Sequence, residues 1–560
     1  MSVGRAALVA VLALSGCECR PAPGPTTPPT TLPEFGPGTK PATGPKLVVC
    51  DELGCPVPAP SGPTGGVLRL AVDAEPSVLC DLVEHDVWSR WIAENWLNET
   101  LIEQDARSGT YGPRLAERFA WSADHKILEL SLRSGVRWHD GKPFSAEDVR
   151  ATLAFVQHDK SGADQKSDLA AVSRVEVVSP TVVRLHLSQA APFLLQALAH
   201  LTMWPAHRLA GIEPARLKEA PLARAPVGTG PYRLARWESG QRIVLQRNPE
   251  YWGTPARLDE LEFRVVRDRG VGLMLVKRGE LDVLWRLPAG RRAEVLADRE
   301  LASSTVYEWT PRAYYFVVYN TRHPALADAR VRQAIDRMID RQRFSTVAFA
   351  GRAPLHTGPY ARGSASYDAT VTTPVRDLAA AQRLLAEAKV KPLDLSSLTF
   401  LATSGSRTVE QLATGLVQDL APLGITLKID SVDFATQLDR LRRGDFLLSA
   451  LQLTVAREQD NYNLFHSSQG KGGQNYAGLH DAEVDKLLDQ IRATASDEAR
   501  HALDRQLHRR LAELVPFSFL VAAPVETLIG PRVRGLVPGN DGFDFRSVTL
   551  VEPGGKASGP

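Results

Sequence analysis

Residues 409–453 read VEQLATGLVQDLAPLGITLKIDSVDFATQLDRLRRGDFLLSALQL, and their apolar side chains alternate between two spacings. From Val409 to Leu420 they recur every three or four residues, which indicates one face of a helix, and Gly424 ends it. The segments that follow are a strand at 425–430, a short helix at 434–441 and an apolar strand at 446–453. Strands that alternate with helices in this way predict βαβ units and a parallel sheet.

The chain on either side of this stretch also mixes helices and strands. Residues 128–132 and 183–187 alternate as half-buried strands, and strands dominate over residues 66–309. Ser145 begins a helix through a capping-box pattern. Helical spacing recurs in the second half of the chain, at 331–339, 484–491 and 503–514. The sequence therefore predicts an α/β protein built from two bodies.

The composition excludes several classes of protein. The chain has 560 residues, enough for three or four folding units, with 44% apolar and 23% charged residues. A formal net charge of +2 argues against nucleic-acid binding as the main task. No apolar run reaches the roughly 18 residues that a membrane-spanning helix needs. The sequence predicts a globular protein that is neither a spanning transporter nor a disordered scaffold.

The N-terminus has the features of an export signal. Arg5 precedes an apolar stretch, Ala6 to Leu14, of the length found in signal peptides, so residues 1–16 are expected to be removed. The sequence Leu14-Ser-Gly-Cys17 resembles a bacterial lipobox, in which the cysteine is lipidated; a plain secretory signal is the alternative. Residues 17–65 are rich in proline and predict an extended tether between a membrane and the folded body.

All five cysteines lie in the first 80 residues, at positions 17, 19, 50, 55 and 80. If Cys17 carries lipid, the other four are available for disulfides in an exported protein. A bridge between Cys50 and Cys55 would close a short loop, and Cys19 with Cys80 is a further possibility. No histidine lies near Cys50 or Cys55, which argues against a metal site there.

Several motifs in a fixed order identify a family. Residues 132–149 read LRSGVRWHDGKPFSAEDV, which resembles the signature of the family 5 extracellular solute-binding proteins. These are the dipeptide, oligopeptide and nickel receptors of ABC importers. The resemblance runs from about residue 67 to 546. Its further pieces are Gly228-Thr-Gly-Pro-Tyr232, Arg247-Asn-Pro-Glu-Tyr-Trp252, Gly279-Glu-Leu-Asp282, Tyr319-Asn-Thr321, Asp328–Ile335, Asn463-Leu-Phe-His466 and Glu483-Val-Asp485.

The resemblance implies a two-lobe periplasmic-binding-protein-like fold of type II with an extra subdomain in the first lobe. The lobes would be residues 66–311 and 312–515, with a C-terminal return to the first lobe over residues 516–560. The resemblance implies capture of a ligand without chemistry, and no cofactor is expected. A metal ligand such as nickel is not expected here, because the histidines of the folded body are dispersed along the sequence. His139 and Asp140 are accordingly interpreted as structural, because no nucleophile motif accompanies them.

The resemblance also places the ligand-binding residues. Peptide-binding members carry an aspartate for the peptide amino group before the Asn-Leu-Phe segment, but residues 453–462 here read LTVAREQDNY. Arg457 falls where that aspartate is expected, and a small gap would bring Glu458 or Asp460 there instead. If Arg457 lines the cleft, it suits an anionic group on the ligand; otherwise it points to solvent and pairs with Glu458.

Two other segments supply candidates. Glu75 and Ser77 lie in a loop that resembles the one approaching the ligand after the first strand of the family, although a solvent-facing loop is the alternative. Tyr314, Tyr315 and Asn320 lie where the chain should cross between lobes, where aromatic residues more often pack the hinge. The candidate ligand-binding residues are Glu75, Ser77, Tyr315, Asn320, Arg457, Glu458 and Asp460.

The sequence thus predicts a monomeric, lipid-anchored receptor in the cell envelope, with its body in the periplasm or outside the cell. It would pass a peptide or other small polar solute to an ABC permease. The alternative is an orphan sensing or structural lipoprotein that keeps the fold but not import. A secreted hydrolase is a third class, for which the sequence shows no nucleophile motif.

Overall fold

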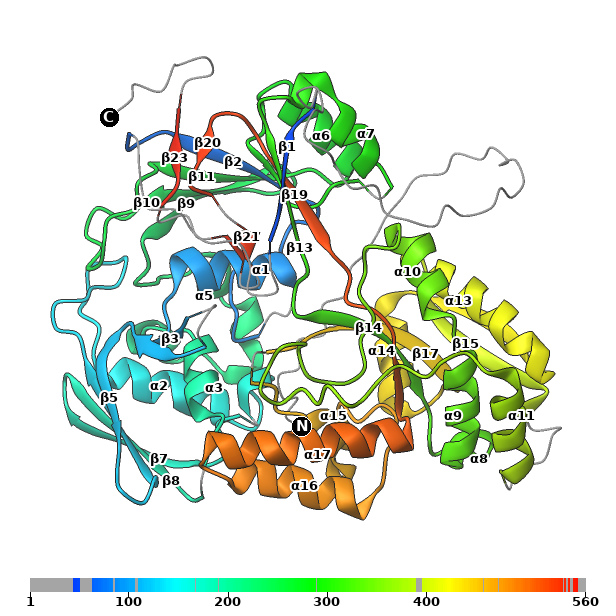
Figure 1. Ribbon diagram of the computed structural model, residues 1–560. Helices are drawn as coiled ribbons and strands as arrows, with labels where there is room; N and C mark the ends of the chain where they lie inside the picture. The colour runs from blue at the N-terminus through cyan, green and yellow to red at the C-terminus, as the bar shows by residue number, and fades with distance from the viewer. Residues whose placement is uncertain are drawn as a thin grey trace.

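The fold is described from a computed structural model of the chain (Figure 1). The described residues are 44–50, 63–83, 86–105, 109–166, 168–189, 191–288, 290–388, 395–456, 458–471, 473–536, 538–539, 542–543 and 547–551. They form two lobes, each around its own sheet, and a subdomain attached to the first lobe. This confirms the predicted two-lobe α/β fold with an extra subdomain.

The first lobe is built on an eight-stranded sheet of order β1-β13-β19-β12-β2-β11-β10-β9. Its strands are β1 (Lys46–Val49), β2 (Val67–Val72), β9 (Tyr232–Glu238), β10 (Arg242–Arg247), β11 (Glu260–Val265), β12 (Val283–Leu284), β13 (Thr305–Trp309) and β19 (Val525–Ile529). Strand β2 is parallel to both neighbours, β11 and β12. Strand β13 runs in the same direction, because both it and β12 are antiparallel to β19.

The extra subdomain is a four-stranded antiparallel sheet packed on helices. Its strands are β5 (Ala116–Trp121), β6 (Ile127–Leu132), β7 (Val172–Ser179) and β8 (Val182–Leu187), in the order β5-β6-β8-β7. Helix α2 (Ala146–Gln157) begins at Ser145 with the predicted capping box, closed by Asp148. The alternating residues of β6 and β8 put their leucines into one core with α2, as their period predicts.

The second lobe is built on a five-stranded sheet of order β16-β15-β17-β14-β18. Its strands are β14 (Ala313–Tyr319), β15 (Ser397–Thr403), β16 (Thr426–Val432), β17 (Leu448–Thr454) and β18 (Phe517–Phe519). The predicted parallel pairing is present between β15 and both β16 and β17. Strand β14 is antiparallel to both of its neighbours, β17 and β18. It leads the chain away from the first lobe, and β18 leads it back.

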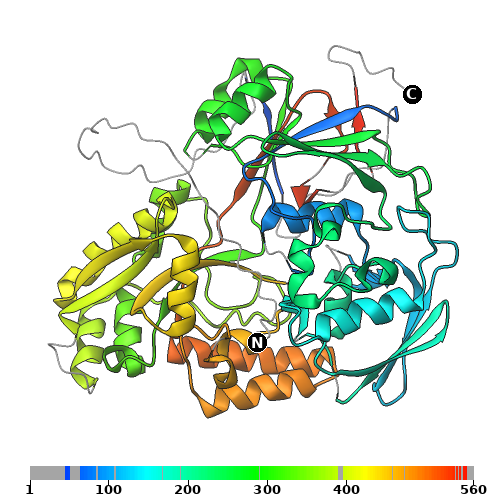
Figure 2. The ribbon, with the colours of Figure 1, turned by 180° about the vertical axis from the view of Figure 1, so that it is seen from behind.

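Helices α13 (Arg407–Leu420) and α14 (Phe434–Arg443) lie where the sequence predicted them. A short 3-10 turn (Ala421–Leu423) follows α13, and Gly424 ends it with a left-handed backbone. Helices α16 (Ala482–Ala493) and α17 (Asp497–Leu514) run from the second lobe toward the extra subdomain (Figures 1 and 2). The other helices are α1 (Val87–Ile92), α3 (Leu194–His200), α4 (Ala206–Leu209), α5 (Pro221–Arg224), α6 (Arg269–Lys277), α7 (Arg292–Ala297), α8 (Pro324–Ala327), α9 (Ala329–Met338), α10 (Arg341–Phe349), α11 (Leu378–Glu387) and α15 (Tyr462–Phe465). A π-helical turn (Ala93–Leu97) follows α1.

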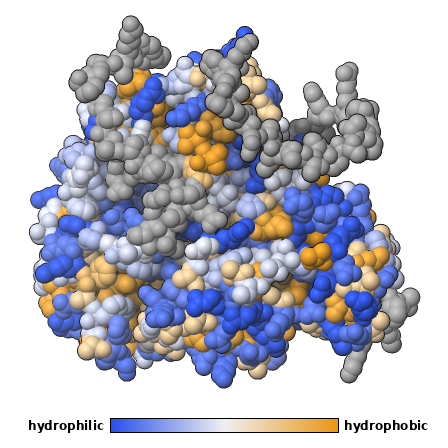
Figure 3. Space-filling view, in the orientation of Figure 1, coloured by the Kyte–Doolittle hydropathy of each residue, from blue (hydrophilic) through white to orange (hydrophobic). Residues whose placement is uncertain are grey.

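Short strands complete the fold: β3 (Ile102–Gln104) pairs with β4 (Tyr111–Pro113), β20 (Val533–Arg534) with β23 (Thr549–Leu550), and β21 (Pro538–Gly539) with β22 (Gly542–Phe543). Within the described residues no helix is long and apolar enough to cross a membrane. Figure 3 shows hydrophilic residues dominating the visible surface over α16 and α17.

Two boundaries differ from the prediction. Residues 46–49, placed in the tether, form β1, because their extended backbone pairs in parallel with the otherwise open edge of β13. The return to the first lobe begins after β18 rather than at residue 516, since β18 still pairs with β14 in the second lobe.

Cys50 follows β1 and is disulfide-bonded, and Cys80 is buried in the core of the extra subdomain. The predicted signal peptide, most of the predicted tether and Cys17, Cys19 and Cys55 lie outside the described residues.

Candidate functional site between the two lobes

The carboxyl ends of the parallel strands of both sheets point toward each other. The chain crosses between lobes at residues 310–312, after β13, and again at residues 520–524, before β19. Strand β14 therefore starts at the junction, and its antiparallel partner β17 ends there at Thr454. Ligands of α/β proteins bind beyond the carboxyl ends of such strands. The region between the two strand edges is thus the candidate site.

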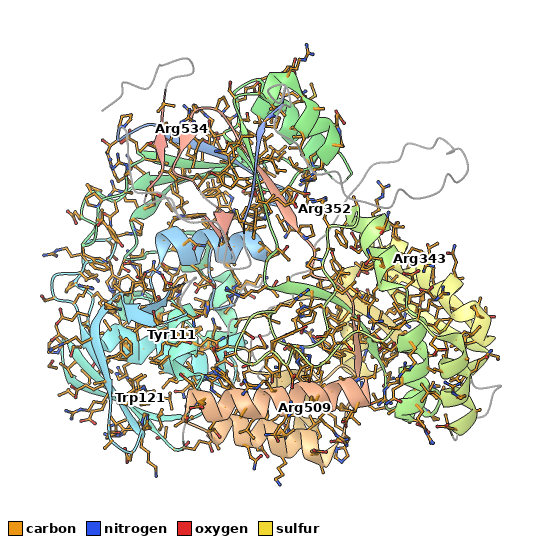
Figure 4. The ribbon with its side chains drawn as sticks, viewed as in Figure 1. Tyr111, Trp121, Arg343, Arg352, Arg509 and Arg534 are labelled. Atoms are coloured by element: carbon orange, nitrogen blue, oxygen red, sulfur yellow. The ribbon has the colours of Figure 1, made fainter. Side chains whose placement is uncertain are left out.

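A salt-bridge cluster joins the lobes beside the crossing segments. Arg352 of the second lobe donates to Glu308 of β13 over 2.9 Å and also contacts Glu526 of β19. Arg292 of α7 donates to the same Glu308 oxygen over 2.9 Å. Burial raises the pKa of Glu526, and the arginines oppose that rise. Figure 4 shows Arg352 at the end of the second lobe nearest the first. This cluster fixes the hinge side of the junction.

Charged and aromatic side chains gather where the strands of the first lobe end. Asp73 follows β2, Arg269 begins α6 after β11, and Arg286 follows β12. Burial tends to raise the pKa of Asp73, but hydrogen bonds from Arg269 (2.8 Å) and Trp88 (2.7 Å) hold it below its usual value. Tryptophans with ring centroids 4.7–5.4 Å apart line the same edge: Trp88, Trp91, Trp96, Trp285 and Trp309.

Arg286 also faces the second lobe. Its guanidinium is close enough to Tyr315 of β14 for each to affect the charge of the other. Burial raises the pKa of the Tyr315 hydroxyl, which Arg286 and Thr408 of α13 counteract. The centre of the junction is therefore lined by residues of both lobes.

The lobes meet a third time on the side away from the hinge. The guanidinium of Arg500 on α17 lies 5.2 Å from the ring centre of Phe193, which precedes α3 in the extra subdomain and packs against the core of the second lobe. Tyr111 of β4 lies close enough to Glu458 of the second lobe to feel its charge. Burial raises the pKa of the Tyr111 hydroxyl, and the Glu458 carboxylate raises it further. Figure 4 labels Tyr111 in the extra subdomain.

The two predicted carboxylates of the second lobe are held by arginines of α16 and α17. Glu458 accepts from Arg500 over 2.7 Å and lies 3.0 Å from His501 Nε2. Asp460 accepts from Arg492 over 2.8 and 2.6 Å. Both carboxylates are thus neutralised from within the second lobe. Arg457, the third residue of that segment, lies outside the described residues.

The other predicted ligand residues have structural partners. Glu75 accepts from Trp237 Nε1 and from the backbone of Gly240, each over 2.8 Å, which ties its loop to the β9–β10 hairpin. Asn320 donates to the carbonyls of Gly444 and Phe446 at the end of β14 away from the junction, so its position argues against ligand contact. Ser77 is exposed. Of these predictions, only Tyr315 lies beside the central cluster.

The family motifs form the frame of the first lobe. Glu99 is fully buried and accepts from Thr229 (2.9 Å), Tyr251 (2.8 Å) and Trp252 (2.8 Å), while Arg114 lies 3.4 Å away. These residues come from three separate stretches of the sequence. The motifs therefore specify architecture rather than a binding surface.

The glycines of the Gly-Thr-Gly motif are required by close packing. A Cβ at Gly228 would lie 1.7 Å from the carbonyl oxygen of Leu97, and one at Gly230 would lie 2.4 Å from that of Trp96. His139 accepts from the backbone of Gly228 through Nδ1 and lies 3.0 Å from the Gly230 carbonyl through Nε2. Its predicted structural role is confirmed. No cluster of metal-binding side chains occurs in the part of the chain that the structure describes.

Sequence reasoning missed the central cluster. Asp73, Arg269 and Arg286 are separated by up to 213 residues and follow three different strands. The available signal is positional, because all three residues follow strands that run in the same direction in one sheet, but the sequence did not predict these three strands individually.

Comparisons with known proteins agree with this architecture. Residues 110–476 match the profile of the bacterial extracellular solute-binding proteins, family 5 Middle. The oligopeptide-binding protein AppA of Bacillus subtilis is 25% identical over 475 residues, covering 81% of this chain and 86% of AppA. The probable D,D-dipeptide-binding periplasmic protein DdpA of Escherichia coli is 27% identical over 436 residues, covering 76% and 81%.

Solved structures share the fold. That of Bacillus subtilis AppA in complex with a nonapeptide has a TM-score of 0.77 at 23% identity, covering 88% of this chain and all of that one. That of Campylobacter jejuni NikZ in complex with Ni(L-His) has a TM-score of 0.74 at 21% identity, covering 86% and 97%.

Proposed function

Because the chain belongs to the family 5 bacterial extracellular solute-binding proteins, we propose that it is the lipid-anchored receptor of an ABC importer, capturing a peptide or other small polar solute between its lobes and releasing it unchanged. The observation that carries this proposal is the geometry of the junction. Two sheets present their parallel strand ends to each other and are joined by only two short crossing segments among the described residues. That layout suits hinged closure around a ligand.

Calorimetry combined with small-angle scattering tests this function. The purified body is titrated with a library of peptides and other polar solutes, and scattering is recorded with and without each binder. We expect at least one solute to bind and to reduce the radius of gyration as the lobes close. Binding without any change in scattering, or conversion of the solute into a product, would count against capture by closure.

The relatives make peptides the first solutes to test, since AppA and DdpA are described as oligopeptide- and dipeptide-binding proteins. The two carboxylates that the resemblance suggested for a peptide amino group are, however, already paired, Glu458 with Arg500 and Asp460 with Arg492. Polar solutes without an amino group therefore belong in the same library.

Phe193 and Arg500 provide a way to test closure. We expect Phe193→Ala to weaken solute binding by roughly 5- to 10-fold, because a cation–π contact and its apolar packing contribute about 1 kcal/mol and hold the lobes together. The measurement is the dissociation constant together with the radius of gyration of the solute complex. Val178→Ala, at an exposed position of the same subdomain, is the control. Equal affinities for the two variants would show that this contact plays no part in closure.

The lipid anchor has its own test. We expect Cys17→Ser to move the protein from the membrane fraction to the soluble fraction of the cell envelope, because lipidation of a lipobox begins at the cysteine thiol, which serine lacks. Detergent phase partitioning and labelling with a radioactive fatty acid measure the change. Cys19→Ser is the matched control and should remain in the membrane fraction. A wild-type protein found in the soluble fraction would favour a plain secretory signal, and membrane retention of the Cys17 variant would show that a lipid on Cys17 is not the anchor.

A further inference from the structure

Arg286 is the one arginine of the central cluster that the protein leaves without a partner. No hydrogen bond or ion pair reaches its guanidinium within the described residues, and its Nε is buried with no acceptor. Asp73, the nearest carboxylate, already uses one oxygen for Trp88 and the other for Arg269. Burial and the neighbouring charge of Arg269 lower the pKa of Arg286.

An unpaired guanidinium in such a place costs stability. Buried charges in proteins are paired or hydrogen-bonded, because removing a charge from water is expensive. Here the pairing of Asp73 with Arg269 leaves Arg286 as the net positive charge of the cluster. Arg286 also lies at the edge where ligands of α/β proteins bind, and it faces Tyr315 of the other lobe.

Trp309 provides a second donor without a partner in the same aromatic group. Its side chain is only 2% exposed, and its Nε1 has no acceptor within the described residues. Its ring packs 5.3 Å from that of Trp285, the residue that precedes Arg286. The junction therefore presents two buried donor groups without a partner among the described residues, Arg286 Nε and Trp309 Nε1.

We propose that Arg286 binds a carboxylate group of the captured solute. The inference rests on the proposed function and specifies its ligand as a carboxylate-bearing solute. A guanidinium matches the two oxygens of a carboxylate with parallel hydrogen bonds. One net positive charge matches a single carboxylate, whereas a doubly charged phosphate ester would remain half-neutralised.

The binding test compares acids with their amides. Short peptides and N-carboxyalkyl amino acids are titrated by calorimetry as free carboxylates and as the corresponding carboxamides. We expect the wild-type protein to bind the carboxylate form roughly 10- to 100-fold more tightly, the range of a charge-assisted hydrogen bond. Arg286→Gln should remove that preference, so that acid and amide bind with similar affinity. Arg216→Gln, an exposed arginine of the first lobe, has the same change in charge and should keep the preference.

A second measurement needs no ligand. Because the unpaired charge destabilises the empty protein, Arg286→Gln should unfold at a higher temperature than the wild type in solute-free buffer. A lower unfolding temperature would mean that Arg286 supports the fold, and the inference would be wrong. Arg286→Lys should bind the carboxylate with intermediate affinity, because an ammonium group cannot form the paired hydrogen bonds.

The outcomes separate this inference from the proposed function. Tight binding of acid and amide alike, or an undiminished preference for the acid in Arg286→Gln, overturns the role of Arg286 while solute capture stands. A wild-type protein that binds none of the solutes and never closes contradicts both.

Discussion

Replacing Glu99 by alanine is expected to lower the free energy of unfolding by about 3–5 kcal/mol, because the change leaves buried donors without their acceptor. The carboxylate is fully buried and receives hydrogen bonds from Thr229, Tyr251 and Trp252. In the alanine variant the hydroxyls of Thr229 and Tyr251 and the indole N–H of Trp252 would all lose their acceptor inside the protein core, where a buried donor without a partner is costly. Urea unfolding followed by tryptophan fluorescence and circular dichroism measures the loss.

Two variants make the result specific to the hydrogen bonds of Glu99. Glu99→Gln keeps the size of the side chain and one carbonyl acceptor, so its loss should be clearly smaller than that of the alanine variant. Glu147→Ala removes an exposed carboxylate of α2 that pairs with the exposed Arg150, and should cost less than about 0.5 kcal/mol. An alanine variant no less stable than Glu147→Ala would show that the motifs do not depend on this carboxylate.

Glu99 also illustrates what the sequence could predict. Local patterns were enough for the elements, as with the capped helix at Ser145 and the alternating strands β6 and β8, because those patterns are set by neighbours in the chain. The convergence of two distant motifs, at residues 228–232 and 247–252, on one carboxylate was not predictable, since it depends on tertiary packing. The same holds for β1, whose pairing with β13 joins segments about 260 residues apart.

The candidate site also separates what local sequence patterns can predict from what depends on tertiary packing. The resemblance pointed to Glu458 and Asp460 as ligand residues, but their arginine partners lie on helices 42 and 32 residues further along the chain. Asn320 belongs to a family motif, yet its side-chain amide donates a hydrogen bond to the carbonyl of Gly444, which lies over 120 residues away in the sequence. Whether a polar side chain is available to a ligand depends on such partners, and no local pattern reveals them.

A second large effect is expected in acid, from a buried cluster between α17 and the loop after α10. Asp504 accepts from Ser366 (2.6 Å) and Tyr360 (2.9 Å), and burial raises its pKa to about 6. Burial lowers the pKa of His508 to about 4, and its Nδ1 accepts from the backbone of Asp368. Burial also lowers the pKa of His356 to about 3, with help from His508 and Arg362.

The direction of the pH effect follows from proton uptake. An unfolded histidine with a pKa of about 6.5 gains its proton before the folded one does, so His356 and His508 lose stability as the pH falls below 6.5. Asp504 binds its proton more readily in the folded state, which adds stability as the pH falls through about 6. The two histidines destabilise the protein in acid and Asp504 stabilises it, and each group changes the free energy of unfolding by about 1.4 kcal/mol per pH unit. The net effect is that of one histidine, which should lower the free energy of unfolding by about 2 kcal/mol between pH 6 and 4.5.

Substitutions in the cluster should change this slope in opposite directions. His356 stacks on Tyr314 with ring centroids 4.6 Å apart, and neither ring nitrogen has a partner among the described side chains and backbone, so phenylalanine fits its place. Urea unfolding at a series of pH values should therefore show His356→Phe losing less stability in acid than the wild type. Asp504→Asn should lose more, at about 3 kcal/mol per pH unit, because the opposing group is gone. Plots of the free energy of unfolding against pH that run parallel for the two variants would contradict the pKa shifts given to His356 and Asp504. The slopes of these plots report the protons bound on unfolding, whereas the absolute stabilities also depend on packing.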